Sequence, residues 1–108
     1  MLRVVQCWDD GVEDDLRLVD LLRRHRATAS FNLNPGLHGW TRSAPWMFRG
    51  AKPVRKLART ELVSAYAGFT IANHTVTHRQ PLKLSLDDWR IEVEDARKRL
   101  QDIFQQPV

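Results

Sequence analysis

Two short polar clusters, each placed directly after an apolar run, constrain the fold of this chain more than any other feature. The first is Asp9-Asp10-Gly11, which follows the apolar run from Leu2 to Trp8. Such a run predicts a buried strand, and the glycine allows the tight turn after it. The second cluster places His74 and His78 four positions apart after the apolar run from Phe69 to Ala72. Parallel strands carry their chemistry at their carboxyl ends, so both clusters are predicted to lie at one sheet edge. Carboxylates with a His-x-x-x-His pair are typical of a site for a divalent metal.

The rest of the chain predicts alternating strands and helices. Residues 13–26 carry the apolar face of a helix, and residues 28–33 are rich in strand-forming side chains. Thr60 is the expected N-cap of a short helix, and Ser85 with Asp88 forms a capping box that starts the longest helix. A stripe along that helix is expected to face the core: Leu86, Trp89, Val93, Ala96, Leu100 and Ile103. Because the strands are apolar throughout, we predict a parallel sheet with outer helices, and a fourth strand opening at residues 107–108.

Composition limits the class of protein. The chain has 108 residues, enough for a single domain, with 43% hydrophobic and 28% charged residues, as in globular proteins. Its net charge of +4 suits an anionic partner, but basic residues are interleaved with acidic ones, so we do not expect a nucleic-acid-binding module. We expect no signal peptide or membrane-spanning segment, hence a cytoplasmic protein. Cys7 is the single cysteine and is expected to be a buried strand residue.

A long segment without a clear pattern runs from residue 37 to about residue 53 and carries Trp40, Trp46 and Phe48. Loops of this length in compact domains are usually functional or mobile. The aromatic side chains either form a wall on which a ligand such as a sugar ring stacks, or simply cover the end of the sheet. His38 has no spacing partner, and we expect it on the surface.

The two clusters and their strand context resemble the polysaccharide deacetylase family, the NodB-like carbohydrate esterases. The likeness rests on Asp9-Asp10-Gly11 after the first strand, on Ala27–Asn32, and on Ile71–Thr75 followed by His78. It implies an α/β fold, a partial (β/α) barrel of the polysaccharide deacetylase type with parallel strands and outer helices. The family's later motifs (Arg-x-Pro-aromatic, Asp-x-x-Asp-Trp and Leu-x-His) are absent from this sequence. Residues 1–108 therefore resemble a single incomplete NodB homology domain, its amino-terminal half.

The resemblance implies a metal-dependent hydrolase that removes acetyl groups from an N- or O-acetylated carbohydrate such as peptidoglycan, a chitin-like polymer or xylan. Carried over by position, it makes Asp9 the general base. Asp10, His74 and His78 become the metal ligands, and Thr75 a residue that braces the ligand loop. The donor set favours zinc, with cobalt, nickel or manganese as alternatives. One carboxylate and two neutral imidazoles leave positions open for water and for the acetyl carbonyl.

Other interpretations stay open at this point. Aspartates and histidines are each common in turns and loops, and in the plainest alternative these four never meet. A second alternative is a truncated, catalytically inactive fragment that binds metal and glycan, because the motif that supplies the general acid is absent. A third is a non-haem iron enzyme with two histidines and one carboxylate. A half-barrel would also expose sheet edges, which predicts either a longer parent protein or self-association through those edges.

Overall fold

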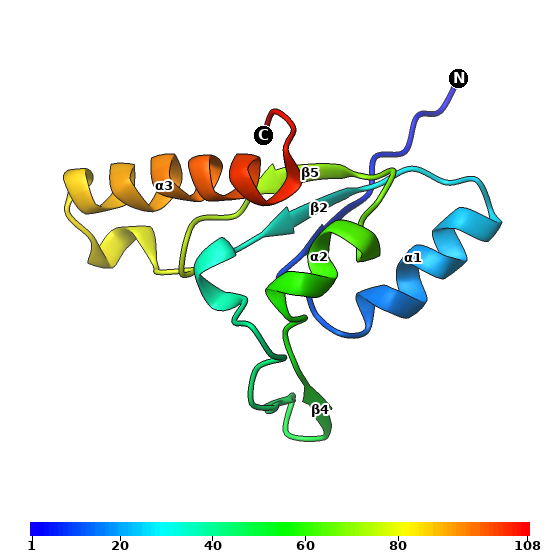
Figure 1. Ribbon diagram of the computed structural model, residues 1–108, viewed down its shortest axis with the longest axis horizontal. Helices are drawn as coiled ribbons and strands as arrows, with labels where there is room; N and C mark the ends of the chain where they lie inside the picture. Colours follow the sequence, from blue (N-terminus) through cyan, green and yellow to red (C-terminus); the bar gives the residue numbers. More distant parts are fainter.

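Three parallel strands form the sheet on which the helices pack, as the computed structural model of residues 1–108 shows (Figure 1). β2 (Ser30–Leu33) lies in the middle, with β1 (Cys7–Asp9) on one side and β5 (Thr70–Asn73) on the other. Because the strands run in the same direction, β1 and β5 end at the same edge of the sheet. The predicted parallel α/β architecture is therefore confirmed, as an open, partial barrel.

The core is a single cluster of buried side chains on one face of the sheet. Phe31 of β2 is fully buried, and the register places it between Trp8 of β1 and Ile71 of β5. Its ring packs on Tyr66, with ring centroids 4.6 Å apart. Each helix adds side chains to the same cluster: Val19, Leu22, Leu62, Ala65 and Leu100. Burial of a large apolar side chain contributes about 1.5–3 kcal/mol, so this cluster holds helices and sheet together.

Three α-helices flank the sheet: α1 (Asp15–Arg24), α2 (Arg59–Ala65) and α3 (Leu86–Phe104). Two single-turn 3₁₀ helices, η1 (Pro35–Leu37) and η2 (Pro81–Lys83), lie in the connections. All three α-helices contribute to one core, as the outer helices of a barrel do, and α3 runs alongside β5 in Figure 1. None of the helices combines the length and the apolar character needed to cross a membrane.

The helix starts were predicted with mixed success. The Ser85 N-cap of α3 is confirmed, because the Asp88 amide donates to Ser85 Oγ at 3.1 Å, but the Asp88 carboxylate accepts from the Ser85 hydroxyl and not from the Ser85 amide, as a capping box requires. The Thr60 cap is wrong. Helix α2 begins two residues earlier, with Ala58 at the N-cap and the Glu61 carboxylate accepting from the Ala58 amide at 2.8 Å. The glutamate three residues on satisfies the free amide without a hydroxyl at the cap.

The first strand is shorter and more exposed than predicted. β1 includes only Cys7–Asp9, and all three residues are exposed. The predictions of a buried strand beginning at Leu2 and of a buried Cys7 are therefore wrong. The reason is topological: β1 is an edge strand with β2 as its one neighbour, so nothing covers its outer side.

The apolar stripe of α3 is buried only in its second half. Ala96 and Leu100 are fully buried, whereas Leu86 is 74% exposed and Val93 38% exposed. The first turns of α3 extend beyond the sheet (Figure 1), so their apolar side chains do not reach the core cluster. The predicted fourth strand does not form, and Val108 packs against the core instead.

The segment after η1, predicted to be irregular, contains an antiparallel hairpin. β3 (Trp46–Phe48) pairs with β4 (Lys52–Val54). Arg49 and Gly50 between them have φ angles of 51° and 68°, which produce the reversal. The hairpin places the aromatic side chains of β3 on a defined element rather than on an open loop.

Behind the hairpin, the chain folds back against the turn that follows β1. Val12 and Lys56 form an antiparallel bridge, and the Leu57 amide donates to the Gly11 carbonyl at 2.9 Å. This path buries His38, which is only 5% exposed, so the prediction of a surface residue is wrong. Its Nδ1 donates to the Leu57 carbonyl at 2.8 Å, while Nε2 has no partner. Burial lowers the pKa of His38, so its imidazole is neutral near pH 7.

Candidate metal centre

The turn after β1 presents two neighbouring carboxylates at the edge of the sheet. Asp9 ends the strand beside Asn32, and the Asp10 amide donates to the Asn32 carbonyl at 3.0 Å. Asp10 and Gly11 then have φ angles of 81° and 63°. Aspartate tolerates this region better than most residues, whereas Gly11 is needed because a Cβ there would lie 2.5 Å from Cε1 of His38. Asp9 is thus the last residue of the strand, whereas Asp10 belongs to the turn that follows it.

The loop after β5 presents the two histidines. The His74 amide extends the parallel ladder by donating to the Leu33 carbonyl at 3.1 Å. Thr75 and His78 have φ angles of 67° and 60°, which costs energy in residues other than glycine. Thr75 Oγ1 accepts from the His78 amide at 3.1 Å, which is the contact that a bracing role requires. Asn34, fully buried, donates from Nδ2 to the carbonyls of His74 and Thr75.

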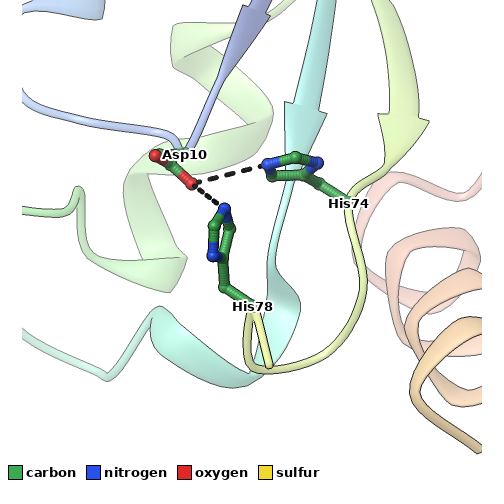
Figure 2. A group of neighbouring side chains, drawn as sticks. All are labelled: Asp10, His74 and His78. Atoms are coloured by element: carbon green, nitrogen blue, oxygen red, sulfur yellow. Dashed lines mark ion pairs between the residues drawn. The ribbon is translucent and has the colours of Figure 1, made fainter. Parts of the chain in front are cut away.

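Figure 2 shows that the side chains of Asp10, His74 and His78 point toward one another. Asp10 Oδ1 lies 3.8 Å from Nε2 of His74 and 3.7 Å from Nε2 of His78. One potential ligand atom of each residue lies within 4.8 Å of the other two. In a tetrahedral zinc site, neighbouring ligand atoms are about 3.3 Å apart. The structure thus brings the three side chains close to the spacing of a metal site.

The chemistry of this donor set fits a divalent metal. Two imidazole nitrogens and one carboxylate oxygen are ligands that zinc accepts, and they leave coordination positions unfilled. The side chains are 30% exposed for His74, 40% for Asp10 and 54% for His78. The cluster therefore faces solvent, where water and a substrate have access to it.

Asp9 lies beside the cluster and outside it. Its Oδ2 is 4.0 Å from His74 Nε2, while its Oδ1 accepts a hydrogen bond from Asn32 Nδ2 at 2.7 Å. Asn32 Oδ1 in turn accepts from Ser30 Oγ at 3.2 Å. Sequence reasoning missed these two supports of Asp9. The sequence does contain a signal for them. Ser30 and Asn32 are polar residues at alternate positions of an apolar strand, and this spacing places both on the face opposite Phe31.

Lys56 is another residue that sequence reasoning missed. Its Nζ donates to the Asp10 carbonyl at 2.7 Å and lies 3.6 Å from Asp10 Oδ1. The side chain is 11% exposed, and burial lowers the pKa of Lys56 while the charge of Asp10 opposes that change. No local pattern marks this lysine among the chain's 17 basic residues, because its contact depends on the path of the segment behind the hairpin.

A hollow of about 370 Å³ lies between the two carboxylates and the hairpin. Asp9 and Asp10 line one part of it, and Trp46 and Phe48 line another. Trp40 is not among the lining residues and is 78% exposed. Of the predicted aromatic wall, the structure therefore brings two residues to the site and leaves the third apart.

A second hollow, of about 210 Å³, lies on the histidine side of the cluster. Its lining includes His74, His78, Arg79 and Trp89. Trp89 was predicted to pack in the core stripe of α3, and this is wrong. It is half-buried beside the histidine loop because the first turns of α3 extend past the sheet.

Known proteins share both the sequence pattern and the fold. A sequence model of the polysaccharide deacetylase family matches residues 3–108. None of the curated proteins compared with the chain matches it. Among solved structures, the Streptococcus pyogenes deacetylase PplD in complex with acetate has a TM-score of 0.74 at 21% identity, covering 97% of this chain and 42% of its own. A Bacillus cereus polysaccharide deacetylase has a TM-score of 0.70 at 18% identity, covering 96% of this chain and 30% of its own. The chain thus spans less than half the length of either relative. Because the family match extends over nearly every residue, the chain belongs to the polysaccharide deacetylase family.

Proposed function

We propose that this chain is the metal-binding part of a hydrolase that removes acetyl groups from an N- or O-acetylated carbohydrate, such as peptidoglycan, a chitin-like polymer or xylan. The observation that carries the proposal is the convergence of Asp10, His74 and His78 beside a separate carboxylate, Asp9. Residues 1–108 would then be one incomplete deacetylase domain. This agrees with their covering 42% and 30% of two solved relatives.

Each residue of the site has a distinct role in this proposal. Asp10, His74 and His78 hold a divalent metal, with zinc favoured over cobalt, nickel and manganese. When bound, such a cation supplies Lewis-acid polarisation of the acetyl carbonyl and lowers the pKa of a water. Asp9 accepts the proton of the attacking water at Oδ2, because Asn32 already donates to Oδ1. Thr75 keeps the histidine loop closed through its bond to the His78 amide.

The hollow beside the carboxylates supports a carbohydrate as the substrate. Trp46 and Phe48 line this hollow together with Asp9 and Asp10. Aromatic side chains present large apolar faces, which suit the apolar face of a pyranose ring. The volume of about 370 Å³ also falls within the range of small-molecule sites, about 300–1,000 Å³. The proposed wall therefore consists of Trp46 and Phe48.

Acetate release tests the proposal. The chain loaded with zinc is incubated with an N-acetylated chito-oligosaccharide and, separately, with acetylated xylan. The Asp9→Asn variant should bind zinc like the wild type, because Asp9 lies outside the ligand set. It should lose about a hundredfold or more in turnover, which is what a general base contributes. Equal turnover by Asp9→Asn and wild type would contradict the role of Asp9.

One observation favours a second candidate, a fragment that binds metal and glycan without turnover. The leaving group needs a proton, and the sequence has no Leu-x-His motif to supply a further imidazole as the general acid. The remaining histidines do not take its place, since His25 follows α1 and His38 is buried and neutral. Zinc binding without acetate release from either substrate would support this candidate. Family membership argues against the non-haem iron enzyme, and elemental analysis of the bound metal tests that alternative.

A further inference from the structure

Glu92 on α3 is a buried carboxylate that the proposed reaction does not use. It is 8% exposed although it lies on a helix rich in exposed charges. Its two oxygens accept from one residue of the histidine loop: Oε2 from the Thr77 amide at 2.9 Å and Oε1 from Thr77 Oγ1 at 2.7 Å. Its backbone carbonyl also accepts from the Val76 amide at 3.1 Å. Glu92 therefore binds the loop between the two histidines at three points.

The two ends of the histidine loop are held differently. The His74 end continues β5, and Asn34 donates to the carbonyls of His74 and Thr75. The His78 end lies beyond the sheet, and His78 itself has a strained φ of 60°. Its amide is held by Thr75 Oγ1, and the residue before it by Glu92. Without the carboxylate, Val76 would keep its backbone hydrogen bonds to Glu92 and Gly36, but Thr77 would lose both of its partners and His78 would keep only the bond from its amide to Thr75 Oγ1.

We propose that Glu92 is a positioning residue: it fixes the His78 side of the metal centre by accepting hydrogen bonds from the amide and the hydroxyl of Thr77. This rests on the proposed metal site. A carboxylate suits the task because two donors need two acceptor oxygens, whereas a glutamine offers one acceptor and turns an NH₂ toward the other donor. Burial by itself raises the pKa of Glu92, but the hydrogen bonds from Thr77 and Val76 hold it below its ordinary value, so the acceptor is ionised near pH 7.

The helix offers a matched control. Glu94 lies on α3 two residues away and is exposed, so Glu94→Gln makes the same change of charge and size without touching the loop. Zinc affinity is measured for wild type, Glu92→Gln and Glu94→Gln by competition with a chromophoric chelator. The melting temperature of each metal-free chain and the visible spectrum with Co²⁺ are recorded beside it.

Glu92→Gln should weaken zinc binding by about 10–100-fold, as loss of a supporting hydrogen-bond partner does, and should alter the Co²⁺ spectrum. Glu94→Gln should change neither. If Glu92→Gln does not fold, Thr77→Val replaces it, and Thr77→Ser should restore the affinity that Thr77→Val loses. Equal zinc affinities for Glu92→Gln and Glu94→Gln, even with a lower melting temperature for the first, would overturn the proposal. A wild type that binds no zinc would instead overturn the metal site itself, and this inference with it.

Discussion

Replacing Gly11 by alanine tests whether the turn that carries Asp10 is set by packing against His38. The added Cβ would lie 2.5 Å from Cε1 and 2.8 Å from Nε2 of His38, and 3.0 Å from Cδ2 of Leu33. The imidazole cannot move away freely, because it is 5% exposed and its Nδ1 is bonded to the Leu57 carbonyl. Because the ring is held in place, we expect the clash to be relieved mainly by a shift of the turn, which carries Asp10.

The size of the effect follows from two terms. Gly11 has a φ of 63°, and a left-handed conformation costs an alanine about 1–2 kcal/mol. Overpacking in a filled site costs a further 1–3 kcal/mol, roughly. Gly50 provides the control, because its φ of 68° is nearly the same and nothing lies within 4 Å of its Cβ position. Gly50→Ala should therefore lose only the free energy that the left-handed conformation costs an alanine.

The assay is urea unfolding of both variants, with the zinc affinity of each measured alongside. Gly11→Ala should lower the free energy of unfolding by about 1–3 kcal/mol more than Gly50→Ala does, and it alone should weaken zinc binding. In a His38→Ala background most of that excess should disappear, because the two nearest atoms are gone. Equal losses for Gly11→Ala and Gly50→Ala, or an excess that persists without His38, would refute the reasoning.

Three further predictions follow from the site, the buried carboxylate and the sheet edge. Native mass spectrometry should find one zinc per chain, lost in Asp10→Ala and His74→Ala; zinc retained by both variants would place the metal elsewhere. The lowered pKa of Glu92 means that its contribution to stability is present above its ordinary value of 4.5 and is lost as the pH falls through the folded pKa. Between pH 3 and pH 6, the free energy of unfolding of wild type should therefore fall more steeply on acidification than that of Glu92→Gln, and parallel curves would contradict this. Sedimentation velocity should show association that grows with concentration, because the β1 edge is unpaired and Val4 and Val5 beside it are exposed. Val5→Lys should weaken it, whereas a monomer at every concentration would exclude self-association.

The meeting of the polar clusters could be predicted because it depends on local patterns and one topological rule. Apolar runs end at Trp8 and Ala72, and parallel strands bring their carboxyl ends to one edge. The exposure of β1 could not be predicted in this way, because an apolar run does not tell an edge strand from a central one. That distinction is made by the neighbours, and β1 has only β2.

The supports of the site escaped prediction for a related reason. His38, Lys56 and Glu92 are polar residues in segments whose local pattern indicates a solvent-exposed position, yet all three are buried. Their burial results from long-range packing: the chain behind the hairpin folds against the turn after β1, and α3 lies against the histidine loop. A single sequence gives the residue types, but it does not show which distant segments come into contact. Asn32 is the exception, since its place in an apolar strand was a visible signal.

Lys56, Asn34 and Glu92 support the proposed metal site through hydrogen bonds that do not need a metal, and this affects what a metal would do to the stability of the chain. The backbone at or next to each proposed ligand is bonded to a residue outside the donor set: Lys56 donates to the Asp10 carbonyl, Asn34 donates to the His74 carbonyl, and Glu92 accepts from the amide of Thr77, which precedes His78. Asp10 Oδ1 lies 3.8 and 3.7 Å from the two imidazole nitrogens, and all three donor atoms lie within 4.8 Å of one another, compared with roughly 3.3 Å in a tetrahedral site. Because these hydrogen bonds and the buried core involve no metal ligand atom, we expect a metal to stabilise the folded chain rather than to fold it. Its effect on stability should follow mass action, about 2.7 kcal/mol at a hundredfold excess over the dissociation constant, instead of the all-or-none folding of a zinc finger.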